Sequence, residues 1–193
     1  MDSFEYMKSR HKQIYMEYID NHIANVKKSF LTYGLVLSKN LGCNVSDLGA
    51  LIVMHDASKY SEAEFEPYRR RFYPMVDAPY DAIGDDDPIF EEAWKHHYTH
   101  NPHHPEYWVK DSKTLPMNSL FIAEMLLDWN AMTYTKGGTT WDWFRNHFDK
   151  SKLHPDTLSI VENVVNKMEN YYNWMEQEKA RELRDLEYAF QAL

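Results

Sequence analysis

The chain has 193 residues, and its content of 44% hydrophobic and 15% aromatic residues is typical of a folded globular protein rather than a disordered one. The length is that of one domain with a substantial buried core. The formal net charge of -9 argues against a protein that binds nucleic acid or anionic membranes through general electrostatic attraction. A small anionic ligand is compatible with this net charge, because a metal ion and a few placed cations can dominate the electrostatic potential at a site.

Cysteine content and the lack of membrane-like segments indicate the compartment. Cys43 is the one cysteine of the sequence, so no intrachain disulfide can form, and we expect a cytoplasmic location. The first ten residues are polar and do not resemble a signal peptide. No apolar run approaches the roughly 20 residues that span a bilayer, so no membrane partner is expected.

Apolar residues recur at spacings of three and four along most of the chain, which predicts amphipathic helices. The expected helices cover residues 13–40, 46–56, 60–73, 88–98 and 116–135, one or two turns within 141–148, and a long helix from Pro155 with a charged tail at 176–187. No segment with useful strand periodicity appears. The sequence therefore predicts an all-α protein.

Polar residues at the predicted helix starts indicate how these helices are capped. Ser46 or Asp47 is expected to cap the second helix, and residues 61–64 resemble a capping box. Asp87 and Pro88 are expected to be the N-cap and first-turn residue of the helix at 88–98.

The connection at 74–87 is predicted to be a loop, and we expect it to form a lid over a site, since long loops in compact domains are often functional. The acidic run at 85–87 is expected to be a solvated helix start rather than a cation site. Three arginines at 69–71 precede this loop. They are interpreted as a solvated helix face, with a phosphate clamp as the alternative.

Three predicted helices each carry polar residues inside an apolar stripe. These residues are His22, the adjacent pair His55 and Asp56, and Asp128. Each alone has an ordinary explanation, such as a buried histidine bonded to a carbonyl group. Four together are harder to explain, because each buried polar group would need a partner of its own. One metal ion satisfies all four, and imidazole with carboxylate suits zinc, iron or manganese.

The order His…His-Asp…Asp resembles that of the HD-domain superfamily of metal-dependent phosphohydrolases, over about residues 10–135. The resemblance, to an uncharacterised bacterial and phage branch, implies an HD-like helical bundle that holds a divalent metal ion and hydrolyses phosphate esters, often of nucleotides. It implies one domain over residues 1–193, with the metal-site core at about 10–135 and C-terminal helices at 141–193.

Lys59, three residues after Asp56, refines this placement. HD-type 5′-nucleotidases typically have an acid at that position, whereas His-Asp-Ala-Ser-Lys is closer to the His-Asp-x-Gly-Lys form of cyclic-dinucleotide phosphodiesterases and of the diiron oxygenase branch. A lysine there can contact a substrate phosphate or carboxylate as a point charge. The alternative is a surface lysine beyond the helix end.

Residues 96–108 are predicted to be irregular, and five histidines lie within residues 96–104. Relatives with two metals carry extra histidines in this interval, and the resemblance implies His97 and His104 as ligands of a second ion, with His103 as the substitute. The alternative is a solvated histidine-rich loop or an adventitious metal site. The Gly-Tyr-Pro signature of the cyclic-dinucleotide phosphodiesterases is absent, so their specificity is not expected.

Further residues have two interpretations each. Arg10 resembles an early arginine that some family members use on the substrate phosphate, or it is a helix-start charge. Glu124, one turn before Asp128, is a partner of a metal ligand or a base. Several aromatic side chains either stack on a nucleotide base or pack in the core: Trp94, Tyr107, Trp108 and Trp129.

The resemblance thus implies a phosphoric ester hydrolase in which a metal-bound hydroxide attacks phosphorus. The expected cofactors are two divalent ions, with Fe, Mn, Zn, Mg, Co and Ni all open. Asp56 and Lys59 are the expected catalytic residues, and Lys59 and Arg10 are expected to bind the phosphate. The expected partner is a nucleotide or other small phosphorylated metabolite, and homo-oligomer formation is open. Two alternatives are a diiron oxygenase and a non-catalytic, metal-containing binding module.

Overall fold

The computed structural model describes residues 3–75 and 78–191 of the chain. The helices of this part, in chain order, are α1 (Ser3–Leu41), α2 (Val45–Met54), α3 (Phe65–Phe72), α4 (Pro88–His100), α5 (Ser119–Lys136), α6 (Thr140–Asn146) and α7 (Pro155–Gln191). Short 3₁₀ turns occupy Ala57–Tyr60, Pro79–Asp81, Pro105–Trp108 and Lys150–Lys152. The all-α prediction is confirmed.

A small antiparallel hairpin is the exception to the helical fold. It pairs β1 (Val109–Lys110) with β2 (Lys113–Thr114), so that Val109 lies opposite Thr114. The expectation of no strand misses this hairpin, because strands of two residues are too short to show an alternating pattern.

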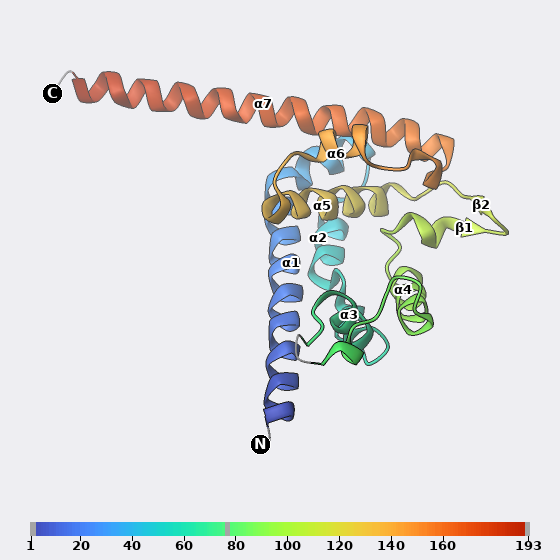
Figure 1. The fold of residues 1–193 in the computed structure, drawn as a ribbon. Helices are drawn as coiled ribbons and strands as arrows, with labels where there is room; N and C mark the ends of the chain where they lie inside the picture. The colour runs from blue at the N-terminus through green and yellow to red at the C-terminus, as the bar shows by residue number, and fades with distance from the viewer. Residues whose placement is uncertain (1–2, 76–77, 192–193) are drawn as a thin grey trace.

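Helix α1 is the long axis against which α2 and α5 pack, as Figure 1 shows. Helix α7 crosses the C-terminal end of α1, and its distal part extends beyond the other helices (Figure 1). Helices α3 and α4 lie together beside the N-terminal half of α1. Residues of α1, α2, α4 and α5 therefore meet on one side of the molecule.

Two apolar clusters hold this arrangement together. The larger one joins α1, α2, α5, α6 and α7 through fully buried side chains such as Leu37, Leu48, Leu126 and Val165. The smaller one joins α1, α3 and α4 through Tyr15, Ile19, Tyr68, Phe90 and Ala93. Burial of each large apolar side chain contributes about 1.5–3 kcal/mol. Along α1 the smaller cluster ends at about Ile23 and the larger begins at Val26, so His22 lies where the two clusters meet.

Several helix starts differ from the sequence-based expectation. The side chain of Asn44, rather than Ser46 or Asp47, caps α2, because its oxygen accepts bonds from both of their backbone N–H groups. Residues 61–64 form a turn and not a capping box, since α3 begins after Glu64 and that side chain makes no cap bond. The prediction for Asp87 is confirmed: it caps α4 by accepting from the backbone of Ile89.

The bounds of α4 and α5 also need correction. Helix α4 continues to His100, so the first half of the histidine-rich segment is helical rather than irregular. The helix-breaking residue is Pro102, and nothing before it interrupts the backbone bonds. Helix α5 begins at Ser119 with Asn118 as its cap, three residues later than Pro116 suggests. It ends, as expected, at Gly137, whose φ of 75° few other residues adopt.

The three arginines of α3 fit neither interpretation given above, because each binds the segment that follows. Arg69, 1% exposed, forms a two-fold ion pair with Asp81 at 2.6 and 2.8 Å. Arg70 donates to the Asp81 carbonyl, and Arg71 pairs with Asp85. These bonds fasten the described parts of residues 74–87 to α3; residues 76 and 77 lie outside the described residues. Asp85 is thus part of an ion pair.

We predict that Asp81→Asn destabilises the protein by about 2–4 kcal/mol at neutral pH, because it leaves the buried Arg69 without its main counter-charge. The Arg69 guanidinium lowers the pKa of Asp81, so this stabilisation is present above the unfolded-state pKa of about 3.9 and is lost as the pH falls through the lower folded-state value. Urea unfolding at neutral and acid pH measures both effects. Asp85→Asn, at an exposed pair, is the control and should change little.

Candidate metal centre

Four polar residues from three parts of the chain meet where the two apolar clusters join. His22 comes from α1, His55 and Asp56 follow α2, and Asp128 comes from α5. His22 Nε2 lies 3.1 Å from Asp128 Oδ1 and 3.4 Å from Asp56 Oδ2. His55 Nε2 lies 3.6 Å from Asp56 Oδ2 and 3.7 Å from Asp128 Oδ1. The structure thus brings together the four residues that the sequence singled out.

The backbone at the end of α2 explains how two adjacent side chains reach one site. Asp56 adopts a left-handed conformation, with φ 56° and ψ 18°, between α2 and the 3₁₀ turn Ala57–Tyr60. Residues other than glycine adopt this conformation at some cost, and Asp tolerates it better than most. The sharp change of direction turns both His55 and Asp56 inward, where they are 2% and 1% exposed.

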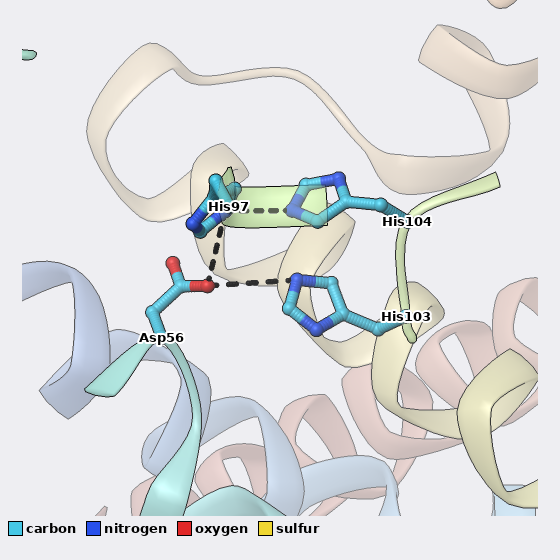
Figure 2. A group of neighbouring side chains, drawn as sticks. All are labelled: Asp56, His97, His103 and His104. Carbon is cyan, nitrogen blue, oxygen red and sulfur yellow. Dashed lines mark hydrogen bonds and ion pairs between the residues drawn. The ribbon is translucent and has the colours of Figure 1, made fainter. Parts of the chain in front are cut away.

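A second set of ligand atoms faces the other oxygen of Asp56, as Figure 2 shows. The Nε2 atoms of His97 and His103 lie 3.5 and 3.6 Å from Asp56 Oδ1. The Nε2 atom of His104 lies 2.9 Å from that of His97. His97 is on α4, and the other two follow its C-terminal end. His97 and His104, the pair selected from the sequence, are both present, and His103 joins them.

The chemistry of these atoms fits bound cations. Several of them are buried with no hydrogen-bond partner among the described residues: His55 Nε2, Asp56 Oδ1 and His103 Nε2. Leaving such an atom unpaired costs about 1–3 kcal/mol. The two groups His22, His55, Asp128 and Asp56, His97, His103, His104 each place their ligand atoms within 4.8 Å of one another. These buried clusters could therefore hold metal ions, and Asp56 is positioned to contact both.

Two buried glutamates contact the Nδ1 atoms of the histidine rings. Glu124 Oε1 lies 3.0 Å from His55 Nδ1 and 3.4 Å from His103 Nδ1. Glu64 lies 2.8 Å from His97 Nδ1 and 2.7 Å from His96 Nδ1. A carboxylate on the far nitrogen fixes the orientation of a ligating imidazole and makes it more basic. Glu124 thus lies where a partner of metal ligands would lie, and Glu64 is a residue that the sequence reasoning missed.

The charges of the site differ between its two sides. Burial alone would lower the pKa of His55, but Asp56, Asp128 and Glu124 outweigh it and raise the pKa to about 10. His22 shows the same balance, with its pKa raised by Asp128 and Asp56. These carboxylates therefore attract positive charge strongly, which protons supply in the absence of metal.

On the other side of Asp56, burial favours the neutral form of two imidazoles, those of His97 and His104. Burial lowers the pKa of His97, and burial together with the neighbouring histidines lowers that of His104 further. Burial would raise the pKa of Asp56, but Lys59 and His55 outweigh it, so the carboxyl group stays ionised. Neutral imidazole and ionised carboxylate are the forms that bind metal.

Of the two cations expected to bind phosphate, the structure brings Lys59 to the site and not Arg10. Lys59 Nζ lies 2.6 Å from Asp56 Oδ2, and its side chain is 14% exposed. It is therefore not a free surface lysine. Arg10 is exposed on α1, about 18 Å along the helix axis from His22, and it does not line the cleft described next.

A cleft of about 560 Å³ opens onto the metal-site residues and is large enough for a small molecule. Lys59 and Lys136 line it, and so do four tyrosines: Tyr15, Tyr18, Tyr68 and Tyr73. The hydroxyl groups of Tyr15 and Tyr68 are buried and have no hydrogen-bond partner within the described chain. No described residue of 74–87 lines the cleft, and residues 76 and 77 lie outside the described residues, so the expectation that this loop is a lid stays a prediction.

Comparison with known families assigns the chain to one of them. A family of unknown function, DUF5662, matches residues 11–167. The chain belongs to this family. The matched region contains every metal-centre residue from His22 to Asp128. None of the curated proteins and none of the solved structures compared with the chain matches it, so the resemblance to HD-domain proteins stays a prediction. Within residues 3–75 and 78–191, no helix has the length and apolar character that a membrane crossing requires.

We predict that adding Mn²⁺, Fe²⁺ or Zn²⁺ to chelator-treated protein raises its melting temperature by about 5–10 °C at metal concentrations near 100 times Kd. His55→Ala should abolish much of this increase, because it removes a ligand atom between Asp56 and Asp128. Thermal scans and elemental analysis measure the effect. His100→Ala, an exposed histidine of α4, is the control. Melting that is independent of every metal would contradict a metal centre.

We also predict that Glu64→Gln weakens metal binding by about 10–100-fold, because the amide holds the His97 ring less firmly and makes it less basic. Competition with a fluorescent chelator measures the affinity. Glu62→Gln, an exposed acid of the same turn, should leave it unchanged. Equal affinities of the two variants would show that Glu64 does not orient a ligand.

Proposed function

We propose that this chain is a metal-dependent phosphohydrolase that acts on a nucleotide or another small phosphate ester. The observation that carries the proposal is that the two oxygens of one buried carboxylate, Asp56, face two separate sets of ligand atoms at the base of a cleft. One set combines two imidazoles with the Asp128 carboxylate, and the other has three imidazoles. Two bound divalent ions would supply an activated water molecule and stabilise the charge on the phosphoryl oxygens.

The residues around the cleft support an anionic substrate. The ammonium group of Lys59 contacts Asp56 and faces the cleft, where it can also contact a phosphoryl oxygen as a compact point charge. The hydroxyl groups of Tyr15 and Tyr68 can donate hydrogen bonds to substrate oxygens. Burial raises the pKa of both hydroxyls above the usual range, so they keep their protons at neutral pH.

A diiron oxygenase is the second candidate. The observation that favours it is the composition of the donor set, in which imidazoles outnumber carboxylates, together with Lys59 on Asp56. Imidazole-rich sites suit iron as well as zinc. Two irons per chain with oxygen consumption and no phosphate release would establish this candidate and reject the hydrolase.

The test is a panel of phosphate monoesters and diesters, assayed for phosphate release by protein loaded with Mn²⁺, Fe²⁺ or Zn²⁺. We expect turnover, and we expect Lys59→Met to lower kcat/KM about 100-fold or more while metal content is retained, because a charge that stabilises the phosphoryl oxygens is lost. Lys39→Met, an exposed lysine of α1, is the control. Metal binding without turnover on any substrate would instead support a non-catalytic binding module.

A further prediction concerns the unpaired tyrosine hydroxyl groups. Tyr68→Phe keeps the ring packed against Phe90 but removes a buried hydroxyl that lacks a partner. The melting temperature should therefore stay the same or rise, while KM for the best substrate rises several-fold. Tyr80→Phe, at an exposed position, should change neither value. A fall in stability with unchanged KM would show that the hydroxyl serves folding rather than binding.

A further inference from the structure

A second hollow, of about 270 Å³, lies beside the metal-site cleft, and Met132 and Lys136 line both. Helix α5 provides this continuity, because Asp128, Met132 and Lys136 follow one another at intervals of four residues along one face of the helix. The distance from Asp128 to Lys136 along the helix axis is about 12 Å. One small molecule with two distinct ends can therefore reach both spaces.

The walls of this hollow, called here the tryptophan groove, are aromatic. Trp129 and Trp143 meet edge to face, with ring centroids 4.9 Å apart and planes at 63°. Trp143 is 40% exposed, which is unusual for so large an apolar side chain and leaves ring surface available for contact. Trp129 is also one of the aromatic residues that the sequence suggested for stacking.

Three polar side chains, called here the polar rim, also line the tryptophan groove: Thr133, Asp142 and His147. An aromatic ring with hydrogen-bonding groups at its edge uses both features, because its face stacks on indole while its edge bonds to the rim. A plain alkyl chain would leave the polar rim unused.

We infer that the tryptophan groove binds a planar aromatic ring carried by the phosphate ester whose phosphate lies at the metal centre. Trp129 and Trp143 are then the residues that determine specificity, and Lys136 lies between the two ends of the ligand. The inference rests on the proposed function for the position of the phosphate, whereas the ring site can be tested without it.

The test compares three probes by calorimetric titration of the metal-loaded protein. Adenosine 5′-monophosphate has a ring and a phosphate, ribose 5-phosphate has no aromatic ring, and adenosine has no phosphate. We expect Trp143→Ala to weaken the binding of both adenosine compounds by about 5- to 150-fold, since stacking of one base on an aromatic side chain contributes about 1–3 kcal/mol. Binding of ribose 5-phosphate should not change.

Two further variants separate recognition from folding. Trp174→Ala removes an exposed tryptophan of α7 outside the groove and is the matched control. Thr133→Met adds volume to the groove without removing a tryptophan, and should weaken both adenosine compounds even if Trp143→Ala destabilises the protein. Melting temperatures of all variants show which of them fold.

The possible outcomes are distinct. The ring site stands if adenosine binds the wild type and the Trp143 and Thr133 variants bind it more weakly. If ribose 5-phosphate does not bind in the same experiment, the phosphohydrolase proposal fails while the ring site stands. If adenosine and its monophosphate bind all variants as they bind the wild type, or do not bind the wild type, the inference is overturned. It is also overturned if light scattering shows that Trp143→Ala converts a dimer to a monomer, because a second copy then occupies the groove.

Discussion

The buried carboxylate of Asp56 is the constraint on which the rest of the site depends. A carboxylate that is 1% exposed must be surrounded by positive charge or hydrogen-bond donors, or the protein would lose several kcal/mol. Lys59 provides one contact, and histidines face both oxygens. The left-handed backbone of Asp56 shows that a local conformational cost is accepted there, where it turns the carboxylate inward.

The fold supplies the rest of the charge environment from parts of the chain that are far apart in sequence. The two apolar clusters fix α1, α2, α4 and α5 so that their polar residues converge where the clusters meet. Glu64 and Glu124 then hold the histidine rings by their outer nitrogens. Because the polar atoms between them remain partly unpaired, the arrangement is that of a site preorganised for cations rather than of a satisfied core.

The shape of the site separates two kinds of recognition. Around the candidate metal centre, Lys59 and the tyrosine hydroxyl groups line the cleft, and the ligand proposed for it is anionic and rich in oxygen. One to two turns further along α5, the side chains become aromatic and apolar with a polar rim. One helix thus carries both surfaces, since residues at intervals of four share a face. The proposed hydrolysis at phosphorus is thereby combined with a preference for phosphate esters that carry an aromatic ring.

Periodicity and residue type in the sequence determined the all-α class, most of the helices and the choice of His22, His55, Asp56 and Asp128 as residues that belong together. Those features are local, and each polar residue was visible as an exception in an apolar stripe. Only the tertiary structure decided that His103 also faces Asp56, that Glu64 supports His97, that Arg10 lies away from the site and that Asp81 pairs with Arg69. These relations depend on how helices and turns pack in three dimensions, and no spacing along the chain encodes such distances.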